Sequence, residues 1–129
     1  MRALFSVLVA SLLLLAAHNG MSRAAIGSGP AAPAAMELLV FEHPDCVYCR
    51  EFRRAVMPRY MQSAAAAEAP LRFIDITRTE TGNLDLKGRI AAVPTAVLMK
   101  DGREFDRIAG YWGPDNFLKM LTHLIARAE

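Results

Sequence analysis

The stretch His43-Pro44-Asp45-Cys46-Val47-Tyr48-Cys49-Arg50 decides the fold of this chain, and it holds the only two cysteines among 129 residues. Cysteines three positions apart lie on one side of a helix that begins there, with the first sulfur facing outward. At a helix N-terminus, free N–H groups and the positive end of the dipole favour a thiolate over a thiol. A thiolate is the species that attacks disulfides, so the spacing indicates a reactive pair.

Three kinds of site are built from a Cys-x-x-Cys pair: a redox site, a metal site and a structural disulfide. A disulfide across so short a loop removes little entropy from the unfolded chain. Structural zinc needs four Cys or His ligands, and His43 alone lies near the pair. These points favour redox chemistry. A periplasmic copper-binding or copper-delivery module that uses Cys46, Cys49 and His43 stays open as the alternative.

The N-terminal segment has the features of a secretory signal peptide. Arg2 precedes an uncharged apolar run, Ala3–Ala17, and small residues allow cleavage after Ala24. The run is shorter than the roughly 20 residues of a membrane span. We expect a signal peptide over residues 1–24, with an uncleaved anchor as the alternative. In either case the folded part is expected outside the cytoplasm, in the periplasm, where disulfides persist.

Residues 25–35 are rich in Gly, Pro and Ala and read as a flexible linker, which leaves residues 36–129 as one small domain. The chain has 15 basic and 13 acidic residues, and removal of Arg2 and Arg23 with the leader leaves 13 of each. This balance gives no reason to expect nucleic acid as a partner, and we expect no stable membrane insertion after cleavage.

The rest of the sequence predicts a βαβ unit, a short helix and a ββα unit. The helix that starts at Cys46, with Asp45 as its N-cap, is expected to kink or end at Pro58. Asp101-Gly102 is typical of a hairpin turn. A strand–helix–strand order implies a parallel pair with a right-handed crossover. The expected strands are 37–41, 71–76, 96–99 and 103–109, and the expected helices are 46–61, 84–92 and one that begins at Pro114.

Residues 36–129 resemble the thioredoxin family. Three features in consistent order carry the resemblance: Cys46-Val47-Tyr48-Cys49 after an apolar strand, Val93-Pro94-Thr95 before the third strand, and Asp101-Gly102 in the hairpin. The resemblance implies a thioredoxin-like α/β fold (βαβ–α–ββα) with a central mixed sheet and flanking helices. It also implies a thiol-disulfide oxidoreductase that needs no cofactor.

The resemblance further assigns roles to individual residues. Cys46 becomes the exposed nucleophile, and Cys49 becomes the buried resolving cysteine. Pro94 becomes a cis-proline, which leaves the Val93 backbone free to pair with an extended substrate. A trans proline that opens the strand is the alternative reading of Pro94.

Two aromatic positions are candidates for substrate contact. Tyr48 is expected to face outward between the cysteines. Trp112, with Tyr111, follows the fourth strand and is expected either to form an apolar rim for the substrate or to pack under the last helix.

The sequence also departs from the family pattern around the cysteines. Asp45 stands where the family has a tryptophan, Val40 where it has a buried aspartate, and Phe73 roughly where it has the partner lysine. Another group must therefore help to move the proton of the resolving cysteine. Glu42 and His43 are the nearest candidates, and Glu42 is expected either to point inward on the side of Val40 or to be a solvated strand end.

The charges around the motif give opposite expectations for the redox potential. Arg50 and Arg53 stabilise a thiolate on Cys46 and make the pair more oxidising, whereas Asp45 opposes this effect.

A narrower resemblance concerns the thioredoxins of bacterial sulfur-oxidation systems, and it rests on Pro44-x-Cys46-Val47-Tyr48-Cys49, the leader and the small size. It implies a periplasmic reductant that acts on exported proteins with disulfides. Such a reductant needs a membrane electron donor to recharge it.

Overall fold

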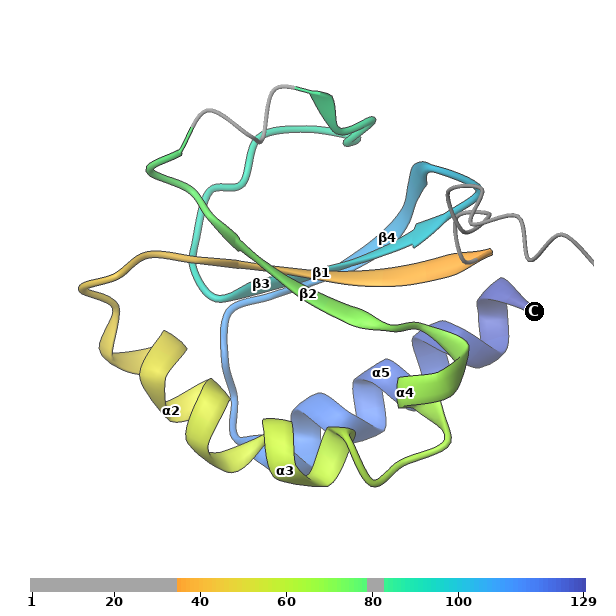
Figure 1. The fold of residues 1–129 in the computed structure, drawn as a ribbon, viewed down its shortest axis with the longest axis horizontal. Helices are drawn as coiled ribbons and strands as arrows, with labels where there is room; N and C mark the ends of the chain where they lie inside the picture. The colour runs from red at the N-terminus through yellow and green to blue at the C-terminus, as the bar shows by residue number, and fades with distance from the viewer. Residues whose placement is uncertain (1–34, 79–82) are drawn as a thin grey trace, which may run out of the picture. The chain divides into compact units, whose positions relative to one another are not determined.

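The computed structural model describes residues 35–78 and 83–129, so the expected signal peptide (1–24) and nearly all of the expected linker lie outside the described residues. The described part is an α/β fold in which the strand order along the chain agrees with the sequence pattern (Figure 1). Its strands are β1 (Met36–Glu42), β2 (Leu71–Asp75), β3 (Thr95–Lys100) and β4 (Arg103–Ala109). Its helices are α2 (Val47–Ala55), α3 (Met57–Tyr60), α4 (Ala65–Glu68) and α5 (Pro114–Ala128).

The four strands form one mixed sheet in the order β2-β1-β3-β4. β1 pairs in parallel with β2, as the expected crossover requires, and antiparallel with β3, which in turn pairs antiparallel with β4. Asp101 and Gly102 connect β3 to β4 with positive φ angles of 51° and 78°. Positive φ at both central residues is the mark of the type I′ hairpin that Asp-Gly favours.

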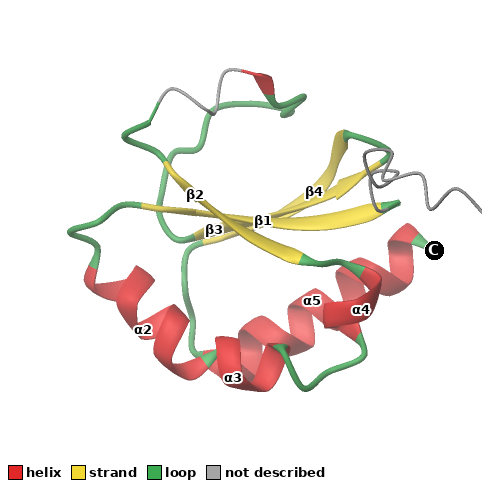
Figure 2. Cartoon of the chain, in the orientation of Figure 1, coloured by secondary structure: helices red, strands yellow, loops and turns green. Residues whose placement is uncertain are grey.

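The helices cover one face of the sheet (Figures 1 and 2). The chain leaves α2 after Ala55 and starts α3 at Met57, so the expected interruption at Pro58 is confirmed. Phe52, Val56 and Tyr60 recur at helical spacing and are buried against the sheet. On α5, the apolar side chains are buried at Phe117, Leu121, Leu124 and Ile125 and half-buried at Leu118.

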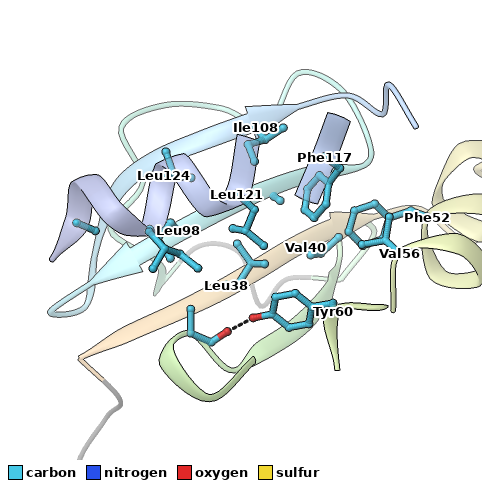
Figure 3. Packing of buried hydrophobic residues seen from close by; sticks show 14 residues of the cluster. Leu38, Val40, Phe52, Val56, Tyr60, Leu98, Ile108, Phe117, Leu121 and Leu124 are labelled. Carbon is cyan, nitrogen blue, oxygen red and sulfur yellow. Dashed lines mark hydrogen bonds between the residues drawn. The ribbon is translucent and has the colours of Figure 1, made fainter. Parts of the chain in front are cut away.

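Figure 3 shows how this core joins the two halves of the chain. Leu38 and Val40 of β1 lie between the side chains of α2 and α3 and those of α5. The hydroxyl of Tyr60 donates a hydrogen bond to the carbonyl of Ala69, which satisfies the one polar atom that this ring buries.

The expected helix over residues 84–92 is wrong. The segment has no helical turn and instead crosses the other face of the sheet, where Leu84, Leu86 and Ile90 pack on a second apolar cluster. Its apolar side chains recur at even spacings, which suits an extended segment, and Gly88 weakens a helix. The second cluster consists of Leu39, Phe41, Ile74, Val97 and Met99.

A buried ion pair between Glu104 and Arg107 of β4 holds residues 84–92 in place through hydrogen bonds. The Glu104 side chain is 1 % exposed and accepts two hydrogen bonds from Arg107, at 2.6 Å each. Its carboxylate also accepts a bond from the Lys87 amide at 2.7 Å, and Arg107 donates to the carbonyls of Gly88 and Arg89. These bonds replace the internal hydrogen bonds that a helix would have supplied. Among the described residues, no helix is long and apolar enough to cross a membrane.

Candidate redox site

Cys46 and Cys49 form a disulfide at the junction between β1 and α2, with their Cα atoms 5.2 Å apart. The two sulfurs differ in access to solvent. Cys46 is half-buried, whereas Cys49 lies inside α2 and is 3 % exposed. Of the two sulfur-bearing residues, Cys46 is therefore the more accessible to solvent.

The helix N-terminus acts on Cys46 itself. Asp45 was expected to be the N-cap, and this expectation is wrong: Cys46 is the N-cap residue, and its sulfur accepts the Cys49 amide at 3.0 Å. The turn closes one residue later than expected because the Cys46 amide bonds to the His43 carbonyl at 3.0 Å. Asp45 is exposed, and its amide donates to Nδ1 of His43 at 3.1 Å. The N–H groups at the helix end are therefore free to stabilise negative charge on the Cys46 sulfur.

The segment before β3 lies directly against Cys46. The Val93–Pro94 peptide bond is cis, as the resemblance implied. The Cys46 sulfur lies 3.7 Å from the Val93 carbonyl oxygen, and the Pro94 carbonyl accepts a bond from the Gly110 amide at 2.9 Å. Three segments that are distant in the sequence thus meet at the disulfide: the start of α2, the turn before β3 and the end of β4.

Three large apolar side chains of the first turn of α2 and of the segment after β4 are exposed. Tyr48 is 66 % exposed and Trp112 is 74 % exposed, and Val47, which the sequence did not single out, is 64 % exposed. Tyr111 behaves differently from its neighbour, because its ring packs edge-on against Phe52 at 5.9 Å. Each of the two expectations for this aromatic pair therefore holds for one residue: Tyr111 packs against the core, and Trp112 faces solvent.

The hydroxyl of Tyr111 is buried without a hydrogen-bond partner among the described residues. Burial, the largest effect, and the nearby Glu51 raise the pKa of Tyr111 above its ordinary value. This phenol therefore stays neutral at physiological pH.

Glu42 lies on the α2 side of the sheet and is bound to Arg53. The Arg53 Nε and Nη2 atoms donate to its two carboxylate oxygens at 2.8 and 2.5 Å. Glu42 is neither a solvated strand end nor an unpaired carboxylate, since its side chain is only 18 % exposed. This pairing was not predicted, because no local pattern signals a contact between residues eleven positions apart.

Arg50 and His43 contact backbone groups in the turn before α2. Arg50 is exposed, and its guanidinium is 3.5 Å from the Pro44 carbonyl. His43 accepts the Asp45 amide and does not join the cysteines: in residues 35–78 and 83–129, no three His, Cys, Asp or Glu side chains gather as a metal-binding group. The structure thus does not provide the third ligand that the metal alternative needs.

Comparison with known proteins agrees with this geometry. Residues 35–125 match the family model of a thioredoxin-like domain. No curated protein matches the chain. A crystal structure of the periplasmic thioredoxin SoxS from Paracoccus pantotrophus, in its reduced form, is 34 % identical, with a TM-score of 0.68 over 73 % of this chain and 99 % of that one.

Two more distant structures share the fold. Mitochondrial thioredoxin 3 from Saccharomyces cerevisiae is 20 % identical, with a TM-score of 0.57 over 70 % of this chain and 80 % of its own. A Malassezia sympodialis thioredoxin is 20 % identical, with a TM-score of 0.56 over 71 % of this chain and 79 % of its own. With a matching family model, a related periplasmic thioredoxin and a Cys46–Cys49 pair at the N-terminus of α2, the chain belongs to the thioredoxin-like family of thiol-disulfide oxidoreductases.

Proposed function

We propose that this protein is an exported reductant that opens disulfides in periplasmic partner proteins through its Cys46-Val47-Tyr48-Cys49 site. One observation carries the proposal: the half-buried Cys46 sulfur accepts the Cys49 amide at the N-terminus of α2, whereas Cys49 is buried behind it. A thiolate at Cys46 is stabilised by this amide and by the helix dipole, and it is the group that a substrate disulfide meets.

The reaction proceeds in two exchange steps. The Cys46 thiolate attacks one sulfur of the substrate disulfide, forms a mixed disulfide, and releases the other substrate sulfur as a thiolate that takes up a proton. The Cys49 thiol then loses its proton and attacks the Cys46 sulfur, which breaks the mixed disulfide. The substrate leaves with two thiols, and the protein is left with the Cys46–Cys49 disulfide, the oxidised form seen in the structure.

The surroundings of the sulfur suit an extended polypeptide substrate. The Val93 carbonyl is 3.7 Å from the Cys46 sulfur and offers a backbone acceptor beside it. Val47 and Tyr48, which follow Cys46 directly, and Trp112, which follows β4, expose apolar surface. In this proposal these side chains contact the residues that flank the substrate cysteine.

The cellular setting of the proposal comes from the leader and from the relative. Residues 1–24 are proposed to act as a signal peptide and residues 25–35 as a linker. The 34 % identity to a periplasmic thioredoxin supports the same compartment. A reductant there needs electrons from a membrane donor, because the periplasm is kept oxidising.

Trapping of mixed disulfides tests the proposed roles. The exported Cys49→Ser protein, isolated from the periplasm after acid quenching, should carry partner proteins on Cys46 that are released by dithiothreitol. The Cys46→Ser protein is the matched control and should carry few or none. Equal trapping by the two variants would overturn the proposed roles.

A further inference from the structure

The Glu42–Arg53 pair joins the end of β1 to α2, and its carboxylate is partly shielded from water. The Glu42 side chain is 18 % exposed and that of Arg53 is 47 % exposed. The Arg53 guanidinium also lies over an aromatic ring, with its central carbon 3.5 Å from the centre of the Phe73 ring. Phe73 in turn packs edge-on against Phe52 of α2. The guanidinium is therefore held in one place by a carboxylate and by an aromatic face.

The Arg53 charge lies on the same helix as Cys49, and Cys46 caps that helix. Arg53 follows Cys49 by four residues on α2, so the two side chains lie on the same side of the helix, one turn apart. Cys46 lies two turns away, at about 10 Å along the helix axis. Glu42 ends β1, one residue before His43, whose carbonyl bonds to the Cys46 amide.

Both oxygens of the Glu42 carboxylate are occupied by Arg53. The pairing raises the pKa of Arg53 above its ordinary value, chiefly through the hydrogen bonds that Arg53 donates to Glu42. A carboxylate held by two charge-assisted bonds is fixed in place beside the guanidinium, so the two groups form one pair.

We propose that Glu42 and Arg53 act together as a charge-balancing pair that sets the redox equilibrium of the Cys46–Cys49 couple. The proposal rests on the proposed thiol exchange at the same two sulfurs. Arg53 alone would stabilise the thiolate of the reduced form, and Glu42 cancels most of that effect. Asp45 and Arg50, the other acidic and basic residues of the motif, are exposed and are not bonded to this pair.

The two members of the pair predict opposite effects on one measurable constant. In exchange with glutathione, the protein dithiol and oxidised glutathione give the protein disulfide and two reduced glutathione molecules. Glu42→Gln leaves Arg53 uncompensated and should shift this equilibrium toward the protein dithiol. Arg53→Gln leaves Glu42 uncompensated and should shift it toward the protein disulfide.

The size of each shift follows from the distance. For a unit charge about 10 Å away, at effective dielectric constants between those of a protein surface and of water, the equilibrium should change about threefold to tenfold. That corresponds to about 15–30 mV for a two-electron couple. High salt should reduce both shifts, because the pair is partly exposed.

The experiment measures the glutathione equilibrium of the exported protein for the wild type, both single variants and the double variant. The double variant removes both charges and should return to within about twofold of the wild type. The exposed Glu51–Arg54 pair on α2 is a matched control, since it has the same residue types and bidentate bonds, at 3.0 and 2.8 Å. Glu51→Gln and Arg54→Gln should change the constant by less than about twofold, because water screens these charges.

Two results would overturn the proposal. Single variants at Glu42 and Arg53 that shift the constant in the same direction would mean that the bridge acts by holding α2 in place. Shifts no larger than those of the control pair would mean that the charges of Glu42 and Arg53 do not affect the redox equilibrium of the two sulfurs. A wild-type protein that fails to exchange at all would instead refute the proposed function, and this inference with it.

Discussion

Phe52 connects the helix that carries the cysteines to the rest of the core, and its replacement should be among the most damaging single changes. The ring is 1 % exposed and makes edge-on contacts with Phe73, Tyr111 and Phe117, at centroid distances of 6.3, 5.9 and 4.7 Å. A buried Phe→Ala change costs about 3–5 kcal/mol through lost burial and the cavity that it leaves. Three aromatic contacts place Phe52 in the upper half of that range.

We therefore expect Phe52→Ala to lower the free energy of unfolding by about 4 kcal/mol, with a fall in Tm of about 15–30 °C. Urea unfolding followed by far-ultraviolet circular dichroism measures the change, and Phe52→Leu gives a milder variant that retains most of the volume. Val47→Ala is the matched control on the same helix, and it should change stability by less than about 0.5 kcal/mol because Val47 is 64 % exposed. A loss below about 1.5 kcal/mol in Phe52→Ala would refute the view that this ring anchors α2.

Three further predictions concern single residues. Burial raises the pKa of Tyr60 to about 12. The neutral phenol therefore contributes fully to the free energy of unfolding below pH 10, and this contribution should fall by up to about 2.7 kcal/mol as the pH rises toward 12. Tyr60→Phe should remove this alkaline loss in urea titrations at pH 8–11, and an unchanged loss would contradict the assignment. Gly102→Ala should lower the free energy of unfolding by about 1 kcal/mol in the same assay. The cost comes from the backbone, since φ is +78° and nothing lies within 4 Å of the added carbon. An unchanged free energy of unfolding would contradict this interpretation of the turn. Hydrogen bonds from Arg107 are the main cause that lowers the pKa of Glu104. The stability that the ionised Glu104 contributes should therefore be full above pH 4.5 and disappear as the pH falls through the pKa of Glu104 in the folded protein. Glu104→Gln should weaken this dependence of stability on acid pH. It should also lower the free energy of unfolding by about 3 kcal/mol at pH 7, because it leaves Arg107 without its partner charge. An unchanged free energy of unfolding would refute the importance of the pair.

The elements that the sequence predicted are those with strong local signals. β1 and β3 are continuous apolar runs, Asp101-Gly102 specifies its turn by backbone conformation, and Pro114 opens an amphipathic helix. In each case the local preference and the tertiary packing favour the same structure. The same agreement explains why the fold and the position of the disulfide followed from the sequence.

The errors arose where tertiary contacts overrode a local preference. Asp is a better N-cap than Cys by propensity, yet the turn at His43 closes so that Cys46 takes that position. The segment 84–92 was expected to be helical, but hydrogen bonds to Glu104 and Arg107 hold it extended. A long-range ion pair of this kind leaves no periodic trace in a single sequence.

The equilibrium redox potential of the Cys46–Cys49 pair distinguishes a reductant of disulfides from a donor of disulfides. It is measured on the exported protein, purified from the periplasm of an expressing bacterium, by titration against glutathione or dithiothreitol. Because Glu42 offsets Arg53, we expect a reductant with a potential near the thioredoxin value of about −270 mV. A value near −120 mV would make the protein a donor of disulfides and refute the proposed function, as would a pair that does not titrate reversibly.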